Sequence, residues 1–132
     1  MLSLIKIGTF MVNNMKAKDL RIGNYVNMDG YPAEVFKITK AFIGCGRFRQ
    51  KNFDEIEPIP LTEEWLIKFG FNKEHNEEWE CNIPVFYLWY NESFKCFQIS
   101  PNSNFPTTLL IKYVHQLQNL YFALTGEDLY LL

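Results

Sequence analysis

A run of basic residues between positions 37 and 51 offers the clearest chemistry in the sequence. It contains interleaved Lys, Arg and Phe side chains, and it contains no Asp or Glu. Cationic side chains can hold phosphate groups, and aromatic rings can stack on bases. Arg47 and Arg49 are two residues apart, so on a strand they would share a face and could fork onto one phosphate. The predicted binding residues for a nucleotide or another anionic small molecule are Lys37, Lys40, Arg47, Phe48, Arg49 and Lys51.

The basic segment also has a structural explanation, because charged side chains on an edge strand prevent aggregation. Residues 1–52 carry nine Lys or Arg and three Asp or Glu, a balance of +6, whereas residues 53–132 carry four and twelve, a balance of −8. The net charge of −2 and the pI near 5.7 argue against a general DNA-binding protein. The sequence also contains no Walker loop and no Rossmann fingerprint.

Two histidines are the other residues that could carry chemistry. His115 has no nearby Ser, Cys or Asp in the sequence to form a nucleophile pair. His75 lies among carboxylates and precedes Cys81, but the spacing matches no usual zinc site. The acidic stretch around it, residues 72–80, is interpreted as a solvated loop or the start of a hairpin. We therefore predict no catalytic residue, no metal ligand and no cofactor, and we keep a hydrolase acting through either histidine as a minor alternative.

The predicted final helix has a polar row beside its apolar stripe. Apolar residues at helical spacing from Val114 to Leu124 predict a buried face, and Gly126 is placed to end the helix. The neighbouring face carries amide and imidazole groups, which predict either a structural histidine with its hydrogen bonds satisfied or a polar row at an interface. The predicted interface residues are His115, Gln118, Asn119 and Phe122.

The elements that would position these residues predict an α+β fold, with a small SH3-like β lobe plus an antiparallel sheet with two helices. Short strands separated by tight Gly turns predict the SH3-like lobe in residues 15–58. Residues 59–132 are predicted to form an α+β lobe that shares a core with it. Its first helix would be capped by Thr62 and ended by Gly70. Residues 1–14 are expected to be a poorly ordered N-terminal extension.

Composition and cysteine usage bear on the compartment. A chain of 132 residues with 48% hydrophobic and 21% charged residues is typical of a globular protein. The odd number of cysteines, without C-x-x-C spacing, predicts reduced thiols and a cytoplasmic location. No run of apolar residues is long enough to span a bilayer, so we expect no membrane association.

Three sequence blocks carry a resemblance to a known group of proteins. They read KAKDLRIGNYV, EPIPLTEEWLIKFGF and YVHQLQNLYFALTGEDL, and together they cover most of residues 16–129. These blocks resemble a family of small uncharacterised proteins encoded by phages and prophages of gut Bacteroidetes. The resemblance implies a start near Met15 and a small accessory protein made inside an infected bacterium.

These observations predict a non-catalytic accessory binding protein of phage type. Its expected activity is counter-defence, through sequestering a nucleotide-type or other anionic ligand on the basic segment. The alternative is a protein–protein interaction or assembly module, either a homo-oligomer or a binder of host proteins.

Overall fold

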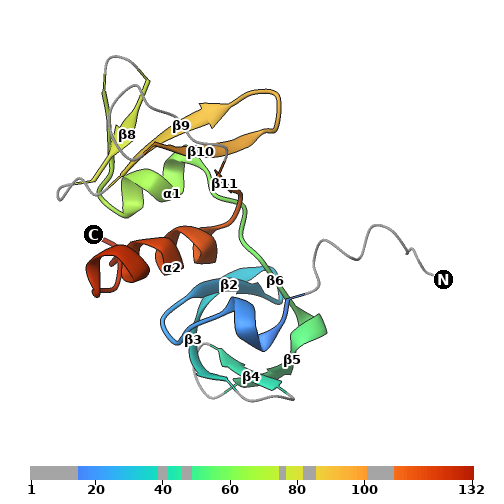
Figure 1. The fold of residues 1–132 in the computed structure, drawn as a ribbon. Coiled ribbons are helices and arrows are strands. Elements are labelled where there is room, and N and C mark those ends of the chain that lie inside the picture. The colour runs from blue at the N-terminus through green and yellow to red at the C-terminus, as the bar shows by residue number, and fades with distance from the viewer. Residues whose placement is uncertain (1–14, 39–41, 46–48, 75–76, 82–85, 101–108) are drawn as a thin grey trace. The chain divides into compact units, whose positions relative to one another are not determined.

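The computed structural model describes residues 15–38, 42–45, 49–74, 77–81, 86–100 and 109–132. These residues form two antiparallel sheets and two α-helices, so the α+β fold class predicted from the sequence is confirmed. The chain divides into two compact units, unit 1 from Met1 to Ile59 and unit 2 from Pro60 to Leu132. Figure 1 shows the elements of both units, and each unit is described by itself.

Unit 1 is a curled antiparallel sheet with the strand order β5-β4-β3-β2-β6. Its first strand, β2, pairs with the last strand, β6, as well as with β3, and this pairing curls the sheet into the SH3-like lobe (Figure 1). Its elements are η2 (Ala17–Asp19), β2 (Tyr25–Met28), β3 (Tyr31–Ile38), β4 (Phe42–Cys45), β5 (Arg49–Asn52), η3 (Phe53–Glu55) and β6 (Ile56–Glu57).

Two local features let this short chain close its sheet. Asp29 and Gly30 have φ values of 54° and 86°, as a two-residue type I′ turn between β2 and β3 requires. The register of β3 against β4 shifts between Val35 and Lys37, and such a bulge bends a strand. The inner face of the curled sheet forms a hydrophobic core. Its buried members are Met15, Leu20, Val26, Met28, Val35, Ile43, Cys45 and Ile56.

Unit 2 is an antiparallel meander with a helix at each end of its sequence. Its sheet has the strand order β11-β10-β9-β8-β7, so neighbours in the chain are neighbours in the sheet. Its elements are α1 (Glu63–Lys68), β7 (Asn72–Lys73), β8 (Trp79–Glu80), β9 (Tyr87–Asn91), β10 (Cys96–Ser100), β11 (Leu110–Ile111) and α2 (Val114–Thr125).

Helix α1 has both ends fixed by its own sequence. At the N-terminus, Thr62 Oγ1 accepts a hydrogen bond from the backbone N of Trp65 at 3.4 Å. At the C-terminus, Gly70 has a φ of 87°, and the backbone N of Phe71 donates to the carbonyl of Leu66 at 2.9 Å. These are the bonds of a Schellman motif, so both predicted caps are confirmed.

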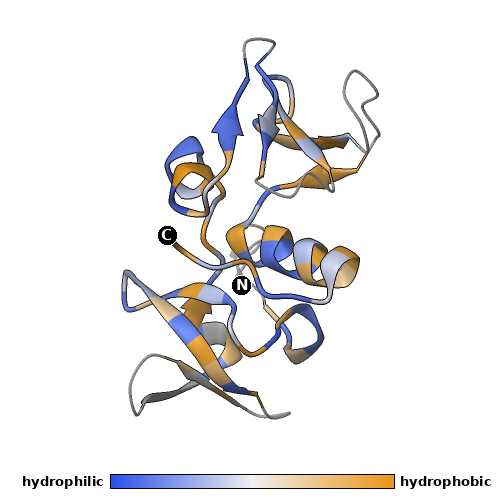
Figure 2. Ribbon diagram, turned by 90° about the vertical axis from the view of Figure 1, so that its left-hand side faces the viewer, coloured by the Kyte–Doolittle hydropathy of each residue, from blue (hydrophilic) through white to orange (hydrophobic). Residues whose placement is uncertain are grey.

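Helix α2 ends where the sequence predicts, but its buried face is shorter than predicted. Gly126 has a φ of 78°, and its backbone N donates to the carbonyl of Phe122 at 2.8 Å. Leu124 was expected in the buried stripe and is 54% exposed. Figure 2 shows hydrophobic and hydrophilic residues along both helices. The period of the apolar residues marks one face of a helix, but it does not fix how much of that face other elements cover. The buried residues of α2 are Val114, His115, Leu117 and Gln118.

Two further findings concern the helices and the cysteines. Within the described ranges, no helix combines the length and apolar character needed to cross a bilayer. All three cysteines are described, and Cys45, Cys81 and Cys96 are buried and form no disulfide. Burial raises the pKa of the Cys45 thiol, which lowers its reactivity.

Candidate functional site

The topology of unit 2 gathers residues that are distant in sequence at one end of its sheet. In a sequential antiparallel meander, alternate connections lie at the same end, so the β7–β8 and β9–β10 connections share one end. Glu63, the first residue of α1, reaches the same place because its carboxylate contacts Lys73 of β7. A site at this end can therefore draw on residues from 63 to 92.

This end of the sheet contains a pocket of about 350 Å³, called here the acidic–aromatic pocket. Small-molecule sites occupy about 300–1,000 Å³, so this volume suits a group of side-chain size. The walls combine aromatic rings with carboxylates and one ammonium group. The lining residues are Glu63, Lys73, Glu77, Trp79, Trp89, Tyr90 and Glu92.

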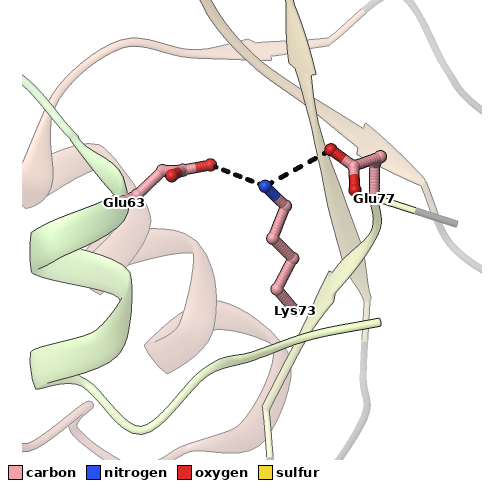
Figure 3. Close-up of polar contacts among 3 residues, drawn as sticks. All are labelled: Glu63, Lys73 and Glu77. Carbon is pink, nitrogen blue, oxygen red and sulfur yellow. Dashed lines mark hydrogen bonds and ion pairs between the residues drawn. The ribbon is translucent and has the colours of Figure 1, made fainter. Parts of the chain in front are cut away.

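Lys73 places its ammonium group between two carboxylates of this pocket, as Figure 3 shows. Its Nζ donates to Glu63 Oε2 at 3.3 Å and lies 3.3 Å from Glu77 Oε1. The same atom lies 5.8 Å from the ring centroid of Trp79, within range of a cation–π contact. Hydrogen bonds to Glu63 and Glu77 raise the pKa of Lys73, so this side chain is a cation at neutral pH.

Contacts within the sheet hold the aromatic walls in place. Trp89 Nε1 donates to Glu78 Oε2 at 3.0 Å, and Glu78 is only 2% exposed. A hydrogen bond to a carboxylate is stronger than a neutral one, so this contact fixes the orientation of the Trp89 ring. Tyr90 lies edge-on to Phe97, with ring centroids 5.3 Å apart. Trp89 and Tyr90 are successive residues of β9, so their side chains leave opposite faces of the sheet, and each is oriented by its own contact.

Glu77 adopts a backbone conformation that L-amino acids rarely adopt, with a φ of 70°. Its backbone N donates to the carbonyl of Glu74 at 3.0 Å, and the backbone N of Glu74 donates to the carbonyl of Glu78 at 2.7 Å. These hairpin bonds hold a left-handed residue, which costs about 1–2 kcal/mol for a residue with a Cβ. Gly would relieve this cost, and strained residues of this kind cluster at functional sites.

Negative charge dominates this end of the sheet. Three Glu and one Lys line the pocket, so its lining has a formal charge of −2. On adjoining β8, the pKa of Glu80 is raised by desolvation first, then by the charge and hydrogen bond of Glu74 and the charge of Glu78. Such a concentration of carboxylates attracts cations and repels anions.

The arrangement is suited to reversible binding of an organic cation. Aromatic faces attract cations, and nearby carboxylates add to that attraction. Within the part of the chain that the structure describes, no group of three or more His, Cys, Asp or Glu side chains could hold a metal ion. His75 lies outside that part, so the hydrolase alternative through this residue stays a prediction.

The basic residues predicted as a ligand site lie in unit 1. Lys40, Arg47 and Phe48 fall outside the described residues. Phe36 is 45% exposed, and a Cβ added to Gly44 would lie 3.0 Å from two atoms of its ring. The absence of a side chain at Gly44 therefore lets the Phe36 ring lie close to the backbone of β4.

Strand register separates the remaining members of the predicted anion site. Lys37 is exposed and pairs with Gly44 across β3 and β4. On β5, the backbone of Arg49 pairs with Cys45 and that of Lys51 pairs with Ile43, so these two occupy other cross-strand rows. The register does not bring the three basic residues into one row, and the anion site stays a prediction.

The residues predicted as an interface on α2 differ in exposure. His115 and Gln118 are 6% and 5% exposed, Asn119 is half-buried, and Phe122 is 36% exposed. The imidazole of His115 stacks on the ring of Tyr113, with centroids 5.9 Å apart and planes 11° apart. Phe122 therefore offers the most surface to a partner, and the interface stays a prediction.

Sequence reasoning missed the acidic–aromatic pocket because its members are not contiguous. Residues 72–80 were interpreted as a solvated loop or the start of a hairpin; β7 and β8 do pair as a hairpin, but the burial of Glu78 was not expected. Trp79 was also overlooked, although a tryptophan amid carboxylates is an unusual component for a solvated loop. A tryptophan within an acidic run was therefore the sequence signal that could have indicated the pocket.

Comparisons with known proteins add no functional assignment. No protein-family model, no curated protein and no solved structure matches this chain. The resemblance to phage-encoded proteins therefore stays a prediction, and the function has to be inferred from the geometry of the pocket.

Proposed function

We propose that the protein is a non-catalytic binding protein that recognises a cationic group in the acidic–aromatic pocket of unit 2. The observation that carries this proposal is the ammonium of Lys73, held by two carboxylates at 3.3 Å each and 5.8 Å from the centre of the Trp79 ring. The pocket thus already binds a cation of its own chain, which is the chemistry it would use for a ligand.

The remaining walls support the same function. Trp89 and Tyr90 add aromatic surface, and Glu92 adds an exposed carboxylate on the turn that follows β9. Burying a cation needs compensating charge, and weakly hydrated organic cations lose the least on leaving water. The lining charge of −2 includes Lys73, so the carboxylates of the pocket outnumber the ammonium group that they hold.

The phage-type accessory role is compatible with this proposal and separate from it. A small accessory protein made in an infected bacterium could capture a host protein through an exposed lysine or another cationic group. Sequestering a nucleotide-type ligand on the basic segment of unit 1 is an independent hypothesis, because it uses other residues and the opposite ligand charge.

The three tryptophans allow a direct test of the pocket in the full chain. Tetramethylammonium is titrated into ¹⁵N-labelled protein, and the indole N–H signals of Trp65, Trp79 and Trp89 are followed by NMR. We expect the signals of Trp79 and Trp89, which line the pocket, to shift with saturation. Trp65 lies under Lys68 in α1 and is the internal control. Equal shifts of all three signals, or none, would reject the proposal.

A further inference from the structure

We infer that Lys73 is a tethered occupant of the acidic–aromatic pocket and that the pocket's ligand is an alkylammonium group that exchanges with it. This inference rests on the proposed function and names its ligand class. A cluster of surface carboxylates would not by itself define such a site. Here the carboxylates border a cavity of about 350 Å³ that has aromatic walls and already holds one ammonium.

The geometry around Lys73 matches an ammonium better than a guanidinium. Glu63 and Glu77 each place one oxygen 3.3 Å from Nζ, and they approach from two different elements, α1 and the β7–β8 hairpin. An ammonium is a compact charge that donates in several directions, whereas a guanidinium prefers two parallel bonds to one carboxylate. The lysine stem beside Trp79 completes the pattern of an apolar chain that ends in a point charge.

Exposure of the same groups permits exchange. The side chain of Lys73 is 38% exposed, and those of Glu63 and Glu77 are 54% and 74% exposed. Lys73 can therefore swing into water while an incoming ammonium takes its place between the carboxylates. The ligand could be a free alkylamine or the lysine side chain of another protein, because both present the same group.

A tethered occupant lowers the apparent affinity for the ligand. Apparent affinity is reduced by the fraction of molecules in which the site is open. If Lys73 occupies the site about nine-tenths of the time, its removal raises the affinity for an alkylammonium ligand about tenfold. A purely structural lysine would instead organise the two carboxylates, and its removal would weaken binding.

The test compares the full-length wild-type protein with Lys73→Met, which keeps most of the apolar stem and removes the charge. Three probes are titrated by calorimetry: n-butylammonium, n-butylguanidinium, and a peptide that has an acetylated N-terminus and a free lysine side chain. We expect Lys73→Met to bind n-butylammonium about tenfold more tightly and both proteins to bind n-butylguanidinium more weakly. Binding of the peptide more tightly than the amine would identify a protein ligand, and the reverse would identify a small molecule.

Lys68→Met is the matched control, because Lys68 lies 5.0 Å from the Trp65 ring centre and 4.0 Å from Glu64 but outside the pocket. It should bind n-butylammonium as the wild type does. Equal or weaker binding by Lys73→Met would overturn the inference while leaving the proposed function intact. If neither protein binds n-butylammonium or tetramethylammonium, the proposed function fails as well.

A measurement on the wild type removes any dependence on the variant's folding. The side-chain CεH₂ signal of Lys73 is followed by NMR as n-butylammonium saturates the protein. Exchange predicts that Lys73 becomes more mobile on saturation, because its ammonium leaves the two carboxylates. An unchanged Lys73 signal in the saturated protein would overturn the inference.

Discussion

The basic segment of unit 1 and the acidic–aromatic pocket of unit 2 bring their charged residues together in different ways. The Lys and Arg residues of the basic segment fall within positions 37–51, but the strand register places the backbones of Lys37, Arg49 and Lys51 in different cross-strand rows. In unit 2 the pocket residues are spread over positions 63–92, and the antiparallel order of the strands collects them at one end of the sheet.

This difference shows that neighbourhood in sequence and neighbourhood in space follow separate rules. Successive residues on a strand point to opposite faces, so a dense run of charge is divided by the sheet that contains it. Residues near alternate connections of a meander converge although many residues separate them. The ligands proposed for the two regions have opposite charge, which makes the comparison testable.

The largest effect is expected from Trp89→Ala, which removes a wall of the pocket. Cation binding should fall about tenfold with the loss of the ring face. The free energy of unfolding should fall by about 2–4 kcal/mol, because the buried Glu78 loses its hydrogen bond from Trp89 as the ring's packing is lost. NMR titration with tetramethylammonium and urea unfolding measure the two effects.

Phe36→Ala is the control for Trp89→Ala, because Phe36 is a partly exposed aromatic residue in unit 1. It should leave cation binding unchanged. If both variants lose cation binding equally, the cation site is not confined to unit 2, and the contrast between the two regions fails.

The second prediction tests the basic segment directly. If it binds a nucleotide, a panel of nucleotides should contain one that stabilises the wild type by about 2.7 kcal/mol at a hundredfold excess over its Kd. Arg47→Ala combined with Arg49→Ala should abolish this effect in a thermal-shift assay. Lys95→Ala combined with Lys112→Ala removes the same charge from unit 2 and should preserve it. A panel without any stabilising nucleotide would reject the basic segment as a nucleotide site.

A smaller effect is expected from Glu92→Gln, which removes one carboxylate of the pocket. Cation affinity should fall about fivefold, as expected for one charge a few ångströms from a ligand in water. Glu64→Gln is the matched control, because Glu64 is an exposed carboxylate beside Glu63 that does not line the pocket. Calorimetry with tetramethylammonium at two salt concentrations separates the charge effect from packing, since salt screens only the former. If Glu92→Gln and Glu64→Gln lose the same amount of cation affinity, the effect comes from the net charge of the protein and not from the pocket.

Glu77→Gly should raise the free energy of unfolding and lower the pKa of Lys73. Glycine adopts the left-handed conformation without the steric cost of a Cβ atom, so the free energy of unfolding should rise by about 1 kcal/mol. Loss of the Glu77 carboxylate should lower the pKa of Lys73, because the hydrogen bond between them raises it. Lys95→Gly is the control, since Lys95 has a φ of 54° and lies outside the pocket. It should gain stability without changing the pKa of Lys73 in an NMR pH titration.

The smallest effect is expected from Glu80→Gln, and it should depend on pH. The folded pKa of Glu80 is raised above its usual 4.5, so the folded state binds this proton more tightly than the unfolded state does. The charge on Glu80 therefore reduces stability once the pH has risen through the folded pKa. Glu80→Gln should raise the Tm at pH 7, and the gain should disappear towards pH 4. The exposed Glu57→Gln in unit 1 is the control, and a gain that is constant with pH would contradict the prediction.

Parts of the fold that depend on neighbouring residues were predictable from the sequence. Thr62 and Gly70 specify the two ends of α1 because a cap is formed by residues three to five positions apart. Gly126 ends α2 for the same reason. The curled sheet of unit 1 was also predicted, because tight turns such as Asp29-Gly30 leave adjacent strands few ways to pair.

Features that depend on distant residues were missed or only partly predicted. The stripe on α2 fails at Leu124, because the apolar period is the same whether or not another layer covers the helix end. The buried Glu78 could not be distinguished from the exposed Glu77 beside it in a run of acidic residues. Its hydrogen bond comes from Trp89, eleven residues away on another strand.

The sequence by itself determined the α+β class, both ends of α1, the C-terminal end of α2 and the opposite charge of the two halves of the chain. Each of these follows from residue types or from interactions within a few positions. Only the tertiary structure decided that Lys73 lies between Glu63 and Glu77 and near the ring of Trp79. The physical reason is that strand order and register set which distant side chains meet. Without that sheet, the same acidic run would be a solvated loop.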